Sequence, residues 1–285
     1  MVEYQTVRVE AHAKINLSLD VVGVLPDGYH RLETVMQRLA LHDILEFAPL
    51  DEEIVLVADG AEVPAGEDNL VVKAARLLAR TTGCRLGARI LLEKRIPVSA
   101  GLGGGSADAA ATLAGLNRLW RLGLEMGQLL GLASGLGADV PFCLAGRTAF
   151  AEGKGDVLTE LAALPAAGVL LVKPPFGVST TQVYAAYDSG PRERLSDARR
   201  MVEAVESGSL ERVAACLGND LEQVTLTRYP ELAAIKRRIL ATGALGALMA
   251  GSGPTVFGLY RSAEDARKAA TRFEGDLTVI ATQTL

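Results

Sequence analysis

The stretch Pro97–Asp108, which runs Pro-Val-Ser-Ala-Gly-Leu-Gly-Gly-Gly-Ser-Ala-Asp, decides how the rest of the chain is interpreted. It holds four glycines, and an alanine-rich segment with apolar residues at helical spacing, Ala107–Trp120, follows at once. Glycine lets the backbone adopt positive φ and approach a ligand closely. The first N–H groups of a helix are unpaired and lie at the positive end of its dipole. The stretch therefore predicts an anion-binding loop, with phosphate as the usual ligand and Ser106 as helix N-cap or as a ligand of phosphate or metal.

Neither of the two common phosphate fingerprints is present. A P-loop needs a lysine after its glycines, and the Gly-Lys pair of this chain, Gly153-Lys154, is followed by another glycine. Counted from Gly101, the third glycine of a dinucleotide fingerprint is replaced by Ser106. The loop thus predicts a phosphate-binding site but does not indicate which fold contains it. The alternative is a flexible loop that precedes an ordinary capped helix.

Composition restricts the class of protein. The chain has 285 residues, 49% of them hydrophobic and 22% charged, which is typical of a globular protein with two domains or one large one. A net charge of −5 and dispersed basic residues argue against a nucleic-acid partner. Three scattered cysteines and three histidines argue against a disulfide framework or a His/Cys metal cage. Met1–Gln5 has no signal segment, and the longest apolar tract, Leu161–Val172, is too short for a membrane span, so a cytoplasmic protein is expected.

Strands and helices are predicted to intermix without regular βαβ alternation, which indicates an α+β fold with two domains. Hydrophobic periodicity and turn residues predict strands at 7–13, 15–24, 35–47, 54–58, 86–92, 169–173, 245–250, 255–259 and 277–281, with shorter ones within 144–158. They predict helices at 68–83, 107–120, 126–132, 181–187, 197–206, 210–217, 231–242 and 263–273. A rise in proline and alanine at 161–168 predicts a boundary between two domains, 1–162 and 163–285.

Lys14 and Asp139 are isolated charges in apolar surroundings. Lys14 interrupts a strand-like run, where a solvated edge position is the alternative to a functional one. Asp139 stands in Gly-Ala-Asp-Val-Pro, where Pro141 is expected to push Val140 into an extended conformation; an Asx-turn is the alternative. Phosphoryl transfer needs a phosphate cradle, a cation and a carboxylate that orients the acceptor. The residues by themselves therefore indicate an enzyme that handles a nucleotide or phosphate.

A turn with a physical basis, Pro26-Asp27-Gly28, precedes an aromatic ring and an imidazole, Tyr29 and His30. A half-buried tyrosine with an incidental neighbour is the alternative to a ligand-binding pair.

The loop Pro97–Ala107 resembles the phosphate loop of the GHMP small-molecule kinases. Four further segments resemble the branch of that family that phosphorylates a cytidine diphosphate-linked methylerythritol: 13–17 (AKINL), 27–30 (DGYH), 136–142 (LGADVPF) and 251–255 (GSGPT). The resemblance covers nearly the whole chain, and DGYH distinguishes this branch from mevalonate, homoserine and galactose kinases. It implies that 1–162 is an ATP-binding domain of the ribosomal S5 domain 2-like fold and that 163–285 is a substrate-side, ferredoxin-like domain. It also implies phosphorylation of the acceptor's 2-hydroxyl in non-mevalonate isoprenoid precursor biosynthesis.

The resemblance also implies the roles of particular residues. ATP is expected at Asn69, Lys94, Pro97, Val98, Ser99, Ala100, Gly101, Leu102, Gly103, Gly104, Gly105, Ser106 and Ala107, with Ser106 near Mg²⁺. Lys14 and Asp139 are expected to be catalytic, and Asn16, Tyr29, His30 and Tyr184 to bind the acceptor. The expected partner is this small molecule, with no nucleic acid or membrane, and the protein is expected to be a monomer or a homodimer.

Some positions depart from the family pattern, among them Ser99 and Ala100 within the loop. His12 stands where proline is common, and Leu25 stands where a basic residue is common, which puts a charge contact from that turn to the substrate diphosphate in doubt. Two other functions stay open: a GHMP kinase with a homoserine- or mevalonate-type acceptor, and a non-catalytic nucleotide-binding module.

Overall fold

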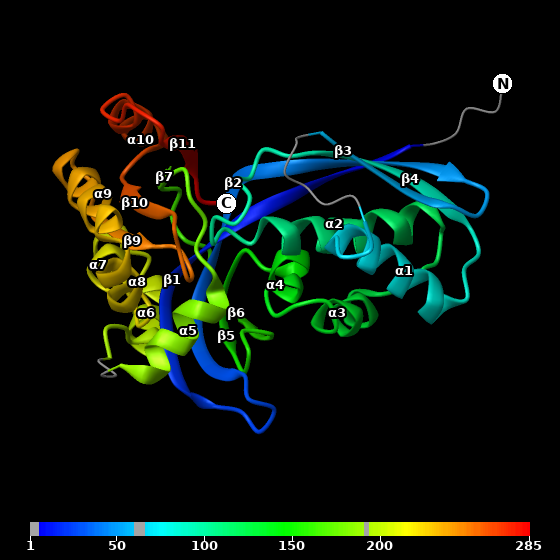
Figure 1. The fold of residues 1–285 in the computed structure, drawn as a ribbon, viewed down its shortest axis with the longest axis horizontal. Coiled ribbons are helices and arrows are strands. Elements are labelled where there is room, and N and C mark those ends of the chain that lie inside the picture. The colour runs from blue at the N-terminus through cyan, green and yellow to red at the C-terminus, as the bar shows by residue number, and fades with distance from the viewer. Residues whose placement is uncertain (1–5, 60–65, 191–193) are drawn as a thin grey trace. The chain divides into compact units, whose positions relative to one another are not determined.

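The computed structural model describes residues 6–59, 66–190 and 194–285 (Figure 1). The expectation that residues 1–5 contain no signal segment concerns residues outside this range. Strands and helices alternate irregularly along the chain and form two sheets, which confirms the α+β class. Among the helices of the described residues, none combines the length and the apolar composition that a membrane span needs.

The strands are β1 Val7–Val24, β2 His30–Leu50, β3 Ile54–Asp59, β4 Gly87–Glu93, β5 Thr148–Glu152, β6 Val157–Glu160, β7 Gly168–Lys173, β8 Gly218–Asn219, β9 Gly246–Met249, β10 Val256–Tyr260 and β11 Thr278–Gln283. The helices are α1 Leu70–Thr82, α2 Gly104–Leu119, α3 Met126–Ser134, α4 Val140–Ala145, α5 Thr180–Ser189, α6 Ala198–Glu206, α7 Leu210–Ala215, α8 Glu222–Arg228, α9 Pro230–Ala241 and α10 Ala263–Ala270.

The chain divides into two compact units, neither of them continuous in sequence. The first unit comprises the residues up to Ala13, Leu41–Val98 and Gly103–Gly146. The second comprises Lys14–Ala40, Ser99–Leu102 and Arg147–Leu285. The long strands β1 and β2 each contribute residues to both units. The predicted domain boundary at residue 162 falls within the second unit, and the assignment of an ATP-binding and a substrate-side domain stays a prediction.

In the first unit, strands β3 and β4 pair in parallel, and β4 pairs antiparallel with the end of β2. Helices α1 and α2 pack against each other, and α3 and α4 pack on α2 (Figure 1). The contact between sheet and helix is close, because a Cβ on Gly115 of α2 would overlap the ring of Phe47. Glycine is therefore required where α2 crosses β2.

In the second unit, β8 pairs in parallel with β1, and β5 pairs antiparallel with both β2 and β6. A separate four-stranded sheet has the order β11-β7-β10-β9 and is antiparallel throughout. Helices α9 and α10 pack on this sheet, where fully buried side chains such as Val172 and Met249 form the core. This arrangement holds the turn 250–255, which leads from β9 to β10.

Three local predictions are wrong. The segments 7–13 and 15–24 form one continuous strand. Ser106 is not the N-cap of α2, because the helix starts at Gly104 and its N-cap is Gly103 with a φ of 70°. Val140 is not extended, since it opens the short helix α4 with Pro141 in the first turn, a position that proline tolerates well. Helix α8 and strand β8 were not predicted.

Candidate active site

The first turn of α2, at the end of the glycine loop, has no side-chain cap on its backbone N–H groups among the described residues. A Cβ on Gly104 would meet Ile96 at 3.1 Å, and one on Gly105 would meet Leu70 at 3.6 Å. The residues that follow β4 and the start of α1 thus pack beside the turn. Such a helix N-terminus favours an anion.

Lys94 lies beside this turn and is held by two buried carboxylates. Its ammonium donates to Asp43 at 2.5 Å and to Asp108 of α2 at 2.8 Å. Asp43 is fully buried and also accepts from the backbone N–H groups of Arg95 and Ile96, at 2.6 and 2.7 Å. Asp43 therefore fixes both the lysine and the residues that lead from β4 into the glycine loop.

The electrostatics of this cluster are asymmetric. Burial opposes the charge of Lys94, yet the attraction of Asp108 and Asp43 and the hydrogen bonds to both raise its pKa above the ordinary value. Burial raises the pKa of Asp108 to about 7; Lys94 opposes that shift and Asp43 adds to it. One oxygen of Asp108, Oδ1, is buried without a hydrogen-bond partner among the described residues. The cluster thus places one ammonium group between two carboxyl groups, and the carboxyl of Asp108 has a raised pKa.

Two other predicted residues of the first unit lie at helix starts. Asn69 is the N-cap of α1, and its side-chain oxygen accepts from the N–H of Val71 at 2.8 Å. Asp139 is the N-cap residue of α4, where its carbonyl accepts from the N–H of Cys143 at 3.0 Å and its side chain is half-buried. The backbone of Asp139 is therefore fixed by the helix that follows it.

Lys14 is not a solvated edge residue, because it is only 4% exposed. Its ammonium donates to Asn16 Oδ1 at 2.9 Å, and Asn16 in turn donates to the hydroxyl of Thr34 at 2.9 Å. Thr34 then donates to the carbonyl of Ser18 at 2.5 Å. A buried ammonium requires such partners, so this chain of hydrogen bonds fixes Lys14 and Asn16 on β1.

The part of the glycine loop that belongs to the second unit lies against a second glycine turn. The N–H of Lys14 donates to the carbonyl of Leu102 at 3.0 Å. Gly101 has a φ of 76°, and a Cβ there would overlap the carbonyl oxygen of Ala250. The side chain of Asn219 donates to the carbonyl of Gly251 at 2.8 Å. The second unit therefore brings together Lys14, the segment 99–102 and the turn after β9.

His30 and Tyr184 are brought into contact by the second unit. Their rings stack with centroids 4.4 Å apart and planes inclined by 23°. The Nε2 atom of His30 lies 2.9 Å from Asp188 Oδ1, one helical turn after Tyr184 on α5. The sequence reasoning missed Asp188, because the helix was predicted to end at residue 187, whereas α5 extends to Ser189. The imidazole is therefore oriented by a carboxylate and an aromatic ring.

Tyr29 is 62% exposed, and the ammonium of Lys154 lies 4.1 Å from the centroid of its ring. Lys154 also pairs with Asp27 at 2.6 Å. The hydrogen bond from Lys154, together with one from the N–H of Tyr29, lowers the pKa of Asp27. Lys154, from the Gly-Lys-Gly turn, is a further residue that the sequence reasoning did not place here. Its contacts with Asp27 and Tyr29 join this exposed turn to the Gly-Lys-Gly turn.

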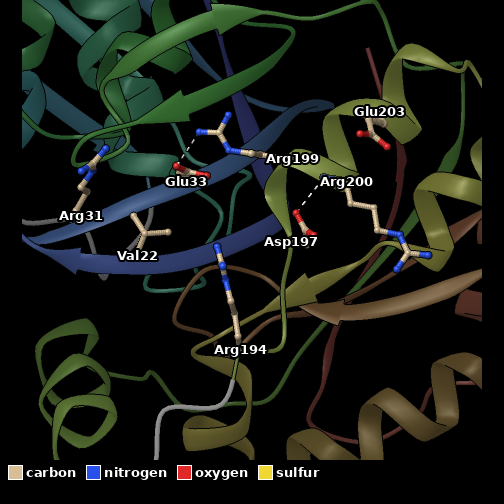
Figure 2. Close-up of a pocket in the computed structure, with 8 residues that line it drawn as sticks. All are labelled: Val22, Arg31, Glu33, Arg194, Asp197, Arg199, Arg200 and Glu203. Atoms are coloured by element: carbon tan, nitrogen blue, oxygen red, sulfur yellow. Dashed lines mark hydrogen bonds and ion pairs between the residues drawn. The ribbon is translucent and has the colours of Figure 1, made fainter.

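A pocket of about 700 Å³ is lined in part by Arg31, which follows His30 in the sequence (Figure 2). Four arginines line it, namely Arg31, Arg194, Arg199 and Arg200. Figure 2 shows the side chains of Arg199 and Glu33 meeting, at a distance of 3.1 Å. Arg194 lies 3.4 Å from the buried Asp20. Two of the four arginines thus neutralise acids of the strands, and the described residues that line this pocket include no predicted site residue.

Comparison with known proteins identifies the family. The model for the GHMP kinases N terminal domain matches residues 69–147, and that for GHMP kinases C terminal matches residues 201–276. A crystal structure of 4-(cytidine 5'-diphospho)-2C-methyl-D-erythritol kinase has a TM-score of 0.80 and 38% identity, and covers 98% of this chain and 99% of that chain. A homoserine kinase from Cytophaga hutchinsonii, at 19% identity and a TM-score of 0.79, shares the fold and covers 100% of this chain and 96% of that chain.

Curated relatives match almost end to end. The chain is 53% identical over 276 residues to 4-diphosphocytidyl-2-C-methyl-D-erythritol kinase of Pelotomaculum thermopropionicum, covering 96% of each chain. It is 48% identical over 267 residues to the kinase of the same name from Moorella thermoacetica, covering 93% of each. The chain therefore belongs to the GHMP kinase superfamily and, within it, to the family of 4-diphosphocytidyl-2-C-methyl-D-erythritol kinases.

Proposed function

We propose that this chain transfers the γ-phosphoryl group of ATP to the 2-hydroxyl of 4-diphosphocytidyl-2-C-methyl-D-erythritol, in non-mevalonate isoprenoid precursor biosynthesis. The observation that carries the proposal is the end-to-end similarity to kinases of that name, at 53% identity over 96% of the chain. The proposal includes a cytoplasmic enzyme, monomer or homodimer, whose partner is a small molecule rather than nucleic acid or membrane.

Residues 97–107 are proposed to hold the ATP phosphates, supported by the uncapped first turn of α2. Asn69 and Lys94 are proposed to lie near the adenosine. Bound ATP supplies the phosphoryl group, and Mg²⁺ supplies neutralising charge. The hydroxyl of Ser106, in the first turn of α2, is an oxygen donor of the kind Mg²⁺ prefers together with phosphate oxygens. Ser106 is therefore proposed as the residue near the metal.

Asp139 is proposed to orient the acceptor hydroxyl and to take its proton as the oxygen–phosphorus bond forms and the bond to ADP breaks. A loose transition state does not require early deprotonation, so positioning is the main task of this carboxylate. The buried ammonium of Lys14, held by Asn16, is proposed to stabilise the negative charge of the transferring group. Asn16 is also proposed to bind the acceptor.

His30 is proposed to read the edge of the cytosine. Its Nε2 is engaged by Asp188, so Nδ1 is the ring nitrogen left for the base. When the imidazole is neutral and Nε2 carries the proton, Nδ1 accepts, and the exocyclic amine of cytosine donates. Tyr29 and Tyr184 are proposed to stack on the base, each contact contributing about 1–3 kcal/mol.

An ADP-release assay with a panel of acceptors tests the proposal. We expect turnover with 4-diphosphocytidyl-2-C-methyl-D-erythritol and at most a trace with homoserine or mevalonate. Turnover with another acceptor alone would leave the kinase class standing and remove the cytidine substrate. ATP binding without turnover on any acceptor would favour a non-catalytic nucleotide-binding module.

A further inference from the structure

Two of the three histidines of the chain meet one glutamate in the first unit, and none of the three residues is assigned to the reaction above. His12 Nε2 lies 3.5 Å from Glu10 Oε2, and His42 Nε2 lies 3.7 Å from Glu10 Oε1. One potential ligand atom from each residue lies within 4.8 Å of the other two. The two imidazole rings are 5.1 Å apart at 60°. Three side chains with metal-binding atoms thus converge on one point.

The strands themselves produce this convergence. Glu10 and His12 are two residues apart on β1 and therefore project from the same face. Ala11 and Ala13, which project from the other face, are buried. Strand β2 brings His42 to His12, and further along the same two strands Arg8 lies 3.9 Å from Glu46. The cluster is therefore built on two neighbouring strands, a more rigid support than a loop.

The distances suit a bound ion better than a direct contact. At 3.5 and 3.7 Å, the nitrogen and oxygen atoms are too far apart for good hydrogen bonds. Tetrahedral zinc with bonds of about 2.0–2.1 Å sets its ligand atoms about 3.3 Å apart. Two imidazoles and one carboxylate are a ligand set that zinc and similar transition metals use, with a water at the fourth position.

We propose that Glu10, His12 and His42 form a binding site for one divalent transition-metal ion of the zinc class, which links strands β1 and β2. The imidazole side chains are about one-fifth exposed, so the ion would be reached from solvent. Mg²⁺ prefers oxygen ligands and water, so it binds poorly to this set. The ligand set of this site therefore differs from the oxygen ligands expected for the magnesium ion that accompanies ATP.

The test uses the full-length chain, stripped of metal and free of nucleotide, in a large excess of Mg²⁺. Zinc affinity is measured by competition with a chromophoric chelator, for the wild type and for Glu10→Gln, His12→Gln and His42→Gln. His30→Gln is the matched control, because it removes the remaining histidine of the chain and leaves the cluster intact. The visible spectrum of bound Co²⁺ reports the ligand set, and circular dichroism checks that each variant is folded.

We expect one zinc per chain, about tenfold or greater loss of affinity in each of the three variants, and wild-type affinity in the control. Zinc should also raise the melting temperature of the wild type and the control, and not that of Glu10→Gln. Unchanged affinity in the three variants, an equal loss in the control, or a thiolate-to-cobalt charge-transfer band that assigns the ion to a cysteine would each overturn the site. Absence of zinc binding at one equivalent would overturn it as well.

Discussion

Replacing Lys94 by methionine removes the cation from a site that holds two buried carboxylates. Asp43 is fully buried and Asp108 is 4% exposed, and both accept from the Lys94 ammonium. Methionine keeps most of the length of the side chain and removes its charge and donors. The expected result is a less stable first unit, with a loss that depends on pH.

The magnitude follows from the pKa of Asp108, which burial raises from 3.8 to about 7. Each unit of pKa shift corresponds to about 1.4 kcal/mol, so the ionised carboxyl costs the folded state roughly 4 kcal/mol. Because the folded pKa is raised, this cost is absent below about pH 4 and complete above about pH 7. Without Lys94 the folded pKa rises further, and breaking a buried ion pair costs about 3–5 kcal/mol. The difference between variant and wild type should therefore be larger near pH 9, where Asp108 is ionised, than near pH 5, where Asp108 is protonated and loses no ion pair.

Urea unfolding followed by the fluorescence of the single tryptophan, Trp120, measures this difference. Trp120 is buried in the same unit, where its indole N–H donates to the carbonyl of Gly87 at 3.1 Å. Lys73→Met is the surface control, since its partner Asp68 is almost fully exposed and such pairs contribute little. The double variant Lys94→Met/Asp108→Asn should regain stability at high pH. A loss below about 1 kcal/mol at pH 9, or an equal loss at pH 5 and pH 9, would refute the reasoning.

Four further outcomes are expected. Asp139→Asn should abolish turnover while ATP binding, measured by calorimetry, survives; near-normal turnover would remove this carboxylate from the reaction. Tyr29→Ala should raise KM for the cytidine acceptor far more than KM for ATP, and equal effects would contradict stacking. Asp188→Asn should raise the acceptor KM about tenfold, by loosening the imidazole it orients, with kcat less affected; an unchanged KM would dismiss this positioning role. Gly101→Ala should destabilise the chain by roughly 1–2 kcal/mol or more in thermal melting, since its φ is positive and its Cβ would collide with a carbonyl, while Gly105→Ala should not; equal stabilities would contradict the packing argument.

The sequence predicted the boundaries of those helices whose ends are determined by residues within one helical turn. Helix α1 starts after its N-cap Asn69, and its C-cap Gly83 has a φ of 68°, in line with the expected boundaries. Side-chain capping and left-handed glycine act over a few residues, so their sequence pattern suffices. Local signals did not predict where α2 starts. Its first residue, Gly104, is helical, and packing against Ile96 leaves little room there for a side chain.

The partners of the site residues were not predictable from local patterns. Asp43 looks like an ordinary polar residue of a strand, and its cation Lys94 is 51 positions away in sequence. Asp20 likewise accepts from the distant N–H of Ala198. Counts of cysteine and histidine do not reveal the proposed metal site either, because the carboxylate of Glu10 joins two histidines there. Such sites depend on strand pairing, which brings distant residues together.

Two glycines of the glycine loop, Gly101 and Gly105, differ in whether the fold requires them. Gly101, which belongs to the second unit, is needed for close approach, because any Cβ there would overlap the carbonyl of Ala250. Gly105, which belongs to the first unit, leaves room for a methyl group, whose nearest neighbour would be Leu70 at 3.6 Å. Its lack of a side chain is therefore not needed for packing. If the first turn of α2 binds phosphate, Gly105→Ala should affect ATP affinity and Gly101→Ala stability, so the two substitutions separate ligand binding from folding within a single loop.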